Sequence, residues 1–390
     1  MNTVYKKINN LFSKDESYRN TEKKISINLK KIMNSRDILK ENVKNTISFS
    51  KPILRINDQP LFYPKTINVI QGKSGANKSR LAEHICSILL KNPESNIALL
   101  GLQSSDINTS VCYVDSERNL SEQYPYSLQQ IKINAGYKIE DEISCLDFIS
   151  LIEIDRAQRF RAFNEYLEMI RQTHKGHIFV ILDVLTDLVD NFNDPKSSLQ
   201  LIDLLNRSIN TYNITFLCII HENPNQDKAR GHLGTELINK SSTALSINYT
   251  KDYKGNDLDI IKIQFLKCRS SKRIDPIFVK FSEEKHNLIF ANNSEIEQAK
   301  HSKEVKANLF DLSKFIIDNV KVKILKRDLL QLLMEKYDCT PRTIETRIKS
   351  IQDEGLLKDL GYELVSTKQS KQVLFELKKI VPNIQQTIFE

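Results

Sequence analysis

Residues 67–82 read Ile-Asn-Val-Ile-Gln-Gly-Lys-Ser-Gly-Ala-Asn-Lys-Ser-Arg-Leu-Ala, and this stretch decides the fold. It opens with a short apolar run that predicts a β-strand, and a helical pattern follows from Lys78. Between the two, the residues align with the phosphate-binding pattern G-x-x-x-x-G-K-S/T, in which Gly72 is first and Lys78 and Ser79 are last. The stretch therefore predicts a strand, a phosphate-binding loop and a helix, in that order.

The residue types in this loop suit the binding of a nucleoside triphosphate. Consecutive backbone N–H groups and the N-terminus of the following helix attract phosphate oxygens. The Lys78 ammonium would reach the β- and γ-phosphates, and the Ser79 hydroxyl would bind Mg²⁺. We therefore expect ATP and Mg²⁺ as cofactors. The expected nucleotide-binding residues are Gly72, Lys73, Ser74, Gly75, Ala76, Asn77, Lys78, Ser79 and Arg80.

One position departs from the pattern, because Asn77 stands where a second glycine is expected. A glycine there supplies unusual backbone angles or leaves room beside the phosphate. Asparagine is the residue other than glycine that best tolerates left-handed backbone angles, so the loop can keep its shape. Two alternatives stay open at this point: an ordinary glycine-rich turn, and a site that binds ATP but hydrolyses it slowly.

Two later apolar runs end in carboxylates. The run His177–Asp183 would deliver Asp183 to the end of a buried strand, where it can organise the water shell of Mg²⁺. The alternative is an aspartate that ends the strand and begins a turn. In the run Val111–Glu117, we expect Glu117 to orient and deprotonate the attacking water, with Asp115 as the rival. We expect this strand to lie beside the strand of the phosphate-binding loop.

A third apolar run, Phe216–Ile220, is followed by His221. This side chain could contact the γ-phosphate or the water and report hydrolysis, or it could simply end a strand. Ligands of open α/β sheets bind at the carboxyl ends of the strands. We therefore expect the loop and the three polar strand ends to meet at one edge of the sheet.

Strand-like runs alternate with helical stretches from about residue 53 to residue 290. The early runs are short, continuous apolar stretches, which is typical of parallel strands buried on both faces. The later runs lack intervening helices, which predicts antiparallel pairing at the end of the sheet. The predicted fold class is α/β with a mostly parallel sheet. The expected divisions are a basic N-terminal arm or helix at 1–50, an ATPase domain at 51–290, a linker at 291–307 and a helical domain at 308–390.

Within residues 1–50, Ile25, Leu29, Ile32 and Met33 recur at helical spacing. One amphipathic helix and a flexible basic arm are both compatible with this segment, which is rich in lysine, asparagine and serine.

Composition narrows the class of protein further. The 390 residues carry a net charge of +8, which fits a polyanionic partner such as nucleic acid. No apolar run approaches the roughly 18 residues that a membrane span requires, so we expect no membrane partner. The six cysteines lie far apart without C-x-x-C spacing, as in the buried, reduced thiols of a cytoplasmic protein.

Taken together, the loop Gly72–Ser79, Glu117, Asp183 and His221 resemble the RecA-like P-loop ATPases, within the RepA/DnaB-type hexameric helicase branch of mobile elements. The resemblance covers residues 53–285 and implies a ring or filament of identical subunits, with a hexamer favoured. It also implies that Lys267 and Arg269 reach into the ATP site of the neighbouring subunit, where a cation stabilises developing charge. Residues 228–240 would form a loop facing a central channel. The residues expected to contact single-stranded DNA there are Lys228, Arg230, His232 and Lys240.

The segment after the linker resembles a winged helix-turn-helix domain. The expected helices are Phe310–Asn319, Lys326–Tyr337 and Thr340–Glu354, and the expected strands are Glu363–Ser366 and Gln372–Leu377. Thr340 and Pro341 would begin the third helix as N-cap and first-turn proline. Early on that helix, the residues expected to reach duplex DNA are Arg342, Thr343, Thr346, Arg347 and Lys349. Lys368 and Lys371 would lie at the tip of the wing. Contact with another protein is the alternative role for such a domain.

The resulting functional hypothesis is an ATP-dependent DNA-binding motor, a helicase-like ATPase acting in the replication or mobilisation of a mobile element. Two alternatives remain. The chain could be a DNA-binding regulator that uses ATP as an assembly switch without unwinding, or a scaffold with a degenerate phosphate-binding loop.

Overall fold

The computed structural model describes residues 16–224, 226–252, 255–269, 271–296, 299, 309–320, 323–369 and 372–380. The chain divides after Lys51 into two units. In the first, helix α2 covers Glu16–Asn42, the helical one of the two alternatives that the sequence left open. The side chains of Leu29, Ile32 and Met33 on this helix are exposed, and that of Ile25 lies outside the described residues.

The second unit contains a large sheet with the strand order β12-β11-β10-β9-β3-β8-β7-β5-β6. Its strands are β3 (Ile67–Gly72), β5 (Thr109–Asp115), β6 (Leu146–Ser150), β7 (His177–Asp183), β8 (Ile214–His221), β9 (Thr243–Lys251), β10 (Asp257–Cys268), β11 (Ile277–Ser282) and β12 (Asn287–Phe290). The strands from β9 to β6 are parallel, and β10, β11 and β12 pair antiparallel. The predicted α/β class, with a mostly parallel sheet that ends in antiparallel pairing, is confirmed.

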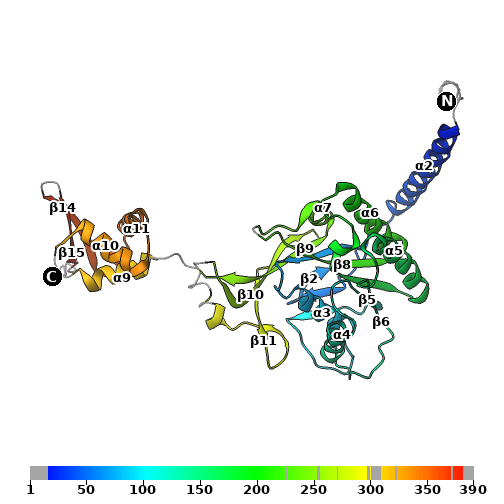
Figure 1. Cartoon of the computed structure of the whole chain (residues 1–390), viewed down its shortest axis with the longest axis horizontal. Helices are drawn as coiled ribbons and strands as arrows, with labels where there is room; N and C mark the ends of the chain where they lie inside the picture. The colour runs from blue at the N-terminus through cyan, green and yellow to red at the C-terminus, as the bar shows by residue number, and fades with distance from the viewer. Residues whose placement is uncertain are drawn as a thin grey trace, which may run out of the picture. The chain divides into compact units, whose positions relative to one another are not determined.

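Helices cover both faces of this sheet (Figure 1). The first face packs against α3 (Lys78–Leu89), α4 (Gln123–Asn134) and a small sheet of β1 (Leu54–Ile56), β2 (Gln59–Phe62) and β4 (Leu102–Ser104). The second packs against α5 (Arg156–Thr173), α6 (Pro195–Thr211), α7 (Gly231–Lys240) and the short η1 (Leu185–Leu188). Side chains alternate along β5, so Tyr113 joins the first core and Cys112 the second. Burial on both faces explains why these strands read as continuous apolar runs.

The position of β5 corrects one expectation about the site. We predicted that the strand leading to Glu117 would lie beside the strand of the phosphate-binding loop, but β8 and β7 separate β5 from β3. After β3 and α3, the chain passes over two strand positions to form β5, and β7 and β8 fill the gap later. Parallel strands need a long crossover, and the crossover does not fix how many positions it passes.

The C-terminal elements enclose a core of their own. They are α9 (Leu309–Asn319), β13 (Ile324–Leu325), α10 (Lys326–Tyr337), α11 (Pro341–Asp353), α12 (Leu356–Asp359), β14 (Tyr362–Gln369) and β15 (Gln372–Lys379). Leu329, Ile344 and Phe375 from three of these elements are buried together, and the strands pair in the order β13-β15-β14. The Thr340 hydroxyl accepts from the Thr343 N–H, so the predicted N-cap of α11 is confirmed. Lys371 lies outside the described residues.

Two further expectations concern membranes and cysteines. Among the described residues, no helix combines the length and the apolar character of a membrane span. All six cysteines are free thiols, and Cys86, Cys112 and Cys218 are buried as expected. Cys145, Cys268 and Cys339 are only half-buried: Cys145 directly precedes the edge strand β6, Cys268 ends β10, and Cys339 lies in the turn between α10 and α11.

Candidate active site

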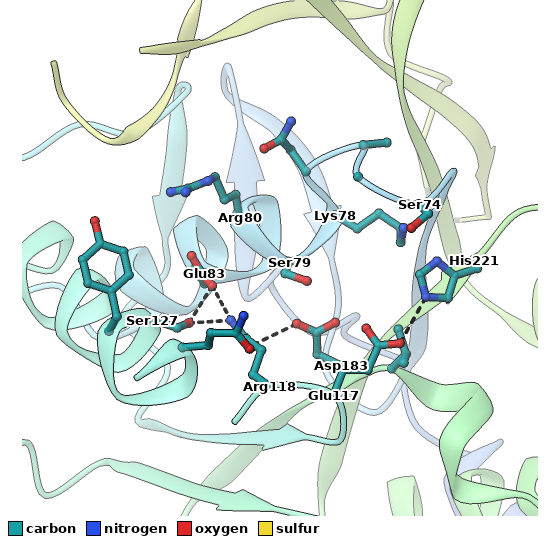
Figure 2. A pocket seen from close by; sticks show the side chains of 16 residues that line it. Ser74, Lys78, Ser79, Arg80, Glu83, Glu117, Arg118, Ser127, Asp183 and His221 are labelled. Carbon is teal, nitrogen blue, oxygen red and sulfur yellow. Dashed lines mark hydrogen bonds and ion pairs between the residues drawn. The ribbon is translucent and has the colours of Figure 1, made fainter. Parts of the chain in front are cut away.

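The carboxyl ends of β3, β5, β7 and β8 meet at one pocket of about 390 Å³, within the usual range for small-molecule sites. Figure 2 shows the phosphate-binding loop above the acidic strand ends in this pocket. Of the predicted residues, Ser74, Gly75, Ala76, Asn77, Lys78, Ser79, Arg80, Glu117, Asp183 and His221 line it. Gly72 and Lys73 lie just outside, at the start of the loop. The structure thus brings together segments that lie far apart in the sequence.

Two glycines allow the loop to take its path. A side chain at Gly72 would meet the Ile247 carbonyl oxygen at 2.3 Å, because β9 passes directly beside β3. Gly75 has φ +75°, a left-handed angle that favours glycine. The Lys73 N–H is anchored by the side-chain oxygen of Asn248 at 2.9 Å, so the base of the loop is tied to β9 as well.

Asn77 also takes a left-handed backbone, with φ 64° and ψ 27°, immediately before α3. The expectation that asparagine would replace glycine by adopting this conformation is confirmed. Its side-chain amide donates to the Tyr249 hydroxyl at 3.0 Å, and this bond ties the loop to β9 a second time. The missing glycine of the pattern therefore leaves the backbone path intact.

This conformation makes a test of the loop possible. Asn77→Ala should be less stable than Asn77→Gly by about 1–2 kcal/mol, because alanine resists the left-handed region and glycine does not. Both substitutions remove the Tyr249 contact, so their difference isolates the backbone effect. Urea unfolding of the two variants measures it. Equal free energies of unfolding would contradict the left-handed conformation.

The Lys78 side chain is buried inside the loop. Its ammonium donates to the Lys73 carbonyl at 2.7 Å, and only 5% of the residue is exposed. Burial lowers the pKa of Lys78, while the charges of Asp183 and Glu117 oppose that change. The loop thus holds a cation against the acidic strand ends, in the place where phosphate oxygens would be attracted.

Ser79 and Asp183 form the part of the pocket that suits a metal ion. Asp183 ends β7 with 4% of its surface exposed, and it lines the same pocket as Ser79 (Figure 2). A hydroxyl and a carboxylate are hard oxygen donors, and Mg²⁺ prefers few such protein ligands together with water and phosphate. The chemistry of these two residues therefore fits Mg²⁺, and their role as its ligands stays a prediction.

The two candidate bases, Glu117 and Asp115, point in different directions. Asp115 is 1% exposed, and both of its oxygens accept from Arg118, one from its backbone N–H and one from its side chain. Glu117 faces the pocket instead, with one oxygen 3.4 Å from His221 Nε2. This hydrogen bond lowers the pKa of Glu117, so the carboxylate is charged at neutral pH. Glu117 is the acid that a water molecule in the pocket can reach.

Sequence reasoning missed two residues that shape the site. Arg118 lines the pocket and pairs with Glu83, Asp115 and Asp183. Glu222 is buried behind the loop, where it accepts from Gln71 at 2.7 Å and from Asn248 at 2.9 Å. Each directly follows a residue that was predicted, Glu117 or His221. That adjacency was the available signal, but charged neighbours are too common for it to stand out.

The segment expected to form a loop facing a channel is partly helical, which corrects that expectation. α7 begins at Gly231, and its Leu233 and Leu237 are buried in the core of the sheet. Residues four positions apart lie on the same face of a helix, so these two leucines let α7 pack one apolar face against the sheet. Only the part before Gly231 is a turn. Of the predicted DNA contacts, Lys228, Arg230 and Lys240 are exposed and His232 is half-buried.

Lys267 and Arg269 make contacts that the sequence did not predict. The Lys267 ammonium donates to the carbonyls of Ile238 and Asn239 at 2.7 and 2.8 Å. Arg269 donates to the Asn239 carbonyl at 2.7 Å. Both cations therefore lie at the C-terminal end of α7, where positive charge is favourable. Neither lines the pocket of its own chain.

The remaining predicted residues lie on α11. Arg342, Thr346 and Lys349 are exposed along this helix, and Thr343 and Arg347 are half-buried. Thr343 takes part in the N-cap, and the Thr346 hydroxyl donates to the Arg342 carbonyl at 2.8 Å. An exposed edge of α11 thus carries two cations.

No protein-family model and no curated protein matches the chain. It is similar to several solved structures. The RadB recombinase is 14% identical to this chain, with a TM-score of 0.41. The match covers 59% of this chain and 92% of that chain. The flagellar accessory protein FlaH from Methanocaldococcus jannaschii is 13% identical, with a TM-score of 0.42. The match covers 59% of this chain and 92% of that chain. The third structure, a solved ATPase domain, is 10% identical, with a TM-score of 0.44. The match covers 67% of this chain and 99% of that chain.

Proposed function

We propose that the chain is a Mg²⁺-dependent ATPase with a RecA-like fold. One observation carries the proposal: four strand ends converge on a single pocket, which holds the loop, the buried Lys78 ammonium and, among its carboxylates, those of Asp183 and Glu117. Backbone N–H groups, a cation and hard oxygen donors are what a Mg²⁺–triphosphate requires. A carboxylate that faces the same cavity supplies the base that hydrolysis needs.

Five residues of the pocket have a role in this proposal. Lys78 binds the β- and γ-phosphates, and Ser79 and Asp183 hold Mg²⁺. When bound, the metal neutralises charge on the phosphate oxygens. Glu117 orients the attacking water and accepts its proton. His221 contacts Glu117, and through this contact it would respond to the state of the γ-phosphate.

We further propose that hydrolysis drives movement on single-stranded DNA. The turn after His221 supports this step, because it carries the exposed cations Lys228 and Arg230. Its two ends are tied to the sheet edge: Arg230 N–H donates to the His221 carbonyl at 2.8 Å, and Glu222 bridges to Ala229. A shift of His221 would therefore move the two cations.

Assembly into a ring or filament, with a hexamer favoured, is also part of the proposal. Arg269 is exposed and lies outside the pocket of its own chain, which suits a residue that serves the site of a neighbouring subunit. For the two side chains to reach a neighbouring subunit, the hydrogen bonds that Lys267 and Arg269 donate to α7 would have to break on assembly.

For the C-terminal elements we propose a winged helix-turn-helix domain that contacts duplex DNA. Their order and separate core support it, together with the exposed Arg342 and Lys349 on α11. The setting that follows from the resemblance to RepA/DnaB-type helicases is replication or mobilisation of a mobile element.

Stimulation by DNA tests the motor proposal. We expect single-stranded DNA to raise ATP turnover, and the double variant Lys228→Ala/Arg230→Ala to lose most of that rise. The variant should also reduce the salt dependence of DNA affinity, by about 0.7 in the log–log slope for each phosphate that is no longer neutralised. Arg161→Ala/Lys175→Ala, which removes two exposed cations elsewhere, is the matched control. Turnover that does not respond to single-stranded DNA would contradict a motor.

Strand displacement on a forked duplex separates the motor from the switch. ATP-dependent displacement supports unwinding. DNA binding and assembly that need ATP, without displacement, would instead favour a DNA-binding regulator that uses ATP as a switch.

A further inference from the structure

Arg118 is the most fully engaged side chain of the pocket. It directly follows Glu117, and 17% of its side chain is exposed. All five N–H groups of its guanidinium have an acceptor within 3.2 Å. The acceptors are Asp115 Oδ2 at 2.6 Å, Glu83 Oε1 at 2.7 Å, Ser127 Oγ at 2.7 Å, Asp183 Oδ2 at 3.0 Å and the Tyr113 hydroxyl at 3.2 Å.

These acceptors belong to four elements that meet behind the pocket. Glu83 is on α3, the helix of the phosphate-binding loop, and Ser127 is on α4. Asp115 ends β5, and Asp183 ends β7. Burial raises the pKa of Glu83 and of Asp115, and the positive charge of Arg118 opposes both changes. A single cation thus holds three carboxylates together in a place where water cannot screen their repulsion.

The cluster fixes the direction of Asp183. Its Oδ2 accepts from Arg118 and also from the Tyr113 hydroxyl at 2.9 Å. Because one oxygen is held by two donors, the other is constrained as well, within the pocket that Ser79 also lines.

The same cluster fixes the turn that carries Glu117. Asp115 Oδ1 accepts from the backbone N–H groups of Glu117 and Arg118 at 3.2 and 2.8 Å. Arg118 in turn holds the other oxygen of Asp115. The orientation of the metal-binding carboxylate and the orientation of the base therefore depend on one guanidinium.

We propose that Arg118 is a positioning residue, which holds Asp183 and the Glu117 turn in the arrangement that a Mg²⁺–triphosphate needs. The proposal rests on the nucleotide-binding function proposed above. Because all of its donors are engaged, Arg118 acts through the carboxylates and is not a phosphate contact. Lysine cannot replace it, since an ammonium has three donors and lacks the planar fork that reaches acceptors on four elements.

The test compares the affinity for a slowly hydrolysed ATP analogue in Mg²⁺ and in EDTA, by calorimetry on the full chain. Arg118→Lys is expected to reduce the gain in affinity that Mg²⁺ provides by about 10–100-fold, the usual effect of removing a partner of a metal ligand. The affinity in EDTA should change little, because the loop itself is intact. A gain from Mg²⁺ that is the same as in the wild type would overturn the proposal.

Two further variants keep the test decisive. Arg159→Lys changes another buried arginine, which donates to the Ile154 carbonyl and to Asp187 outside the pocket. It should lower the unfolding midpoint and leave the gain from Mg²⁺ unchanged; a loss as large as that in Arg118→Lys would mean a merely structural role. Tyr113→Phe removes the second donor to Asp183 Oδ2 and should also reduce the gain in affinity from Mg²⁺. This variant tests the proposal even if Arg118→Lys fails to fold.

The failure of this inference differs from a failure of the proposed function. A wild-type chain that binds the analogue in neither buffer overturns both. A wild-type chain with a clear gain from Mg²⁺, which Arg118→Lys and Tyr113→Phe both retain, overturns only the role of Arg118.

Discussion

Lys78→Ala is expected to lower ATP turnover by about 10²–10³-fold, the effect of removing one preorganised charge donor from a transition state. The Lys78 ammonium is buried in the loop and is held in place by the Lys73 carbonyl. Without it, the backbone N–H groups can still attract a triphosphate, but no Lys78 ammonium would stabilise the negative charge that develops on the γ-phosphate. Steady-state phosphate release in Mg²⁺ measures the change.

The control for this substitution is Lys175→Ala, which removes an exposed lysine outside the pocket. Its turnover should match that of the wild type, because solvent and salt screen the charge of an exposed lysine outside the pocket. If Lys78→Ala retains wild-type turnover, the buried lysine has no part in catalysis and the loop is not a catalytic phosphate-binding loop.

Glu117→Gln should lower turnover by about 10²–10⁴-fold, the usual contribution of a general base, while nucleotide affinity stays close to that of the wild type. Glutamine keeps the size of the side chain and can still contact His221, but it cannot accept a proton from water. The His221 contact lowers the pKa of Glu117, which further favours the charged form that a base requires. Turnover and the dissociation constant of the ATP analogue test the two parts of this expectation.

Asp115→Asn separates the two acids. Asp115 is buried against Arg118, so its replacement should lower the free energy of unfolding, because the asparagine NH₂ group would face the Nε–H donor of Arg118 in place of an acceptor. If Asp115→Asn abolished turnover at unchanged stability, and Glu117→Gln did not, the base would be Asp115 and the assignment would be wrong.

The part of the site that could be predicted is the part that local sequence encodes. The phosphate-binding loop has a fixed spacing, and Asp183 and His221 each follow an apolar run that only a buried strand explains. Because parallel strands all present their carboxyl ends to one edge, these residues had to meet once the class was known. The left-handed backbone at Asn77 followed from the chemistry of asparagine alone.

Arrangements between distant segments could not be predicted in the same way. The separation of β5 from β3 depends on where β7 and β8 insert, which no local pattern records. Arg118 binds partners that lie 35 and 65 positions away in the sequence, Glu83 and Asp183. A single arginine beside a glutamate gives no sign of such partners, since most such pairs lie on solvated surfaces.

α7 was missed for a different reason. Gly231 and Gly234 lower the helix propensity of its first turn, and the resemblance to a channel loop favoured an irregular segment. Tertiary packing overrides the propensity here: Gly234 lies so close to the Ala229 backbone that a side chain would meet it at 2.7 Å. Leu233 and Leu237 then fill the core.

The capture of a Mg²⁺–triphosphate by the loop Gly72–Ser79 is tested most directly by a calorimetric titration of the full chain with a slowly hydrolysed ATP analogue in Mg²⁺. We predict one saturable site per chain, with an affinity that falls when the metal is chelated, because Ser79 and Asp183 would hold the ion that offsets the charge of the phosphates. The absence of binding heat at millimolar analogue, together with an unchanged melting temperature, would contradict it.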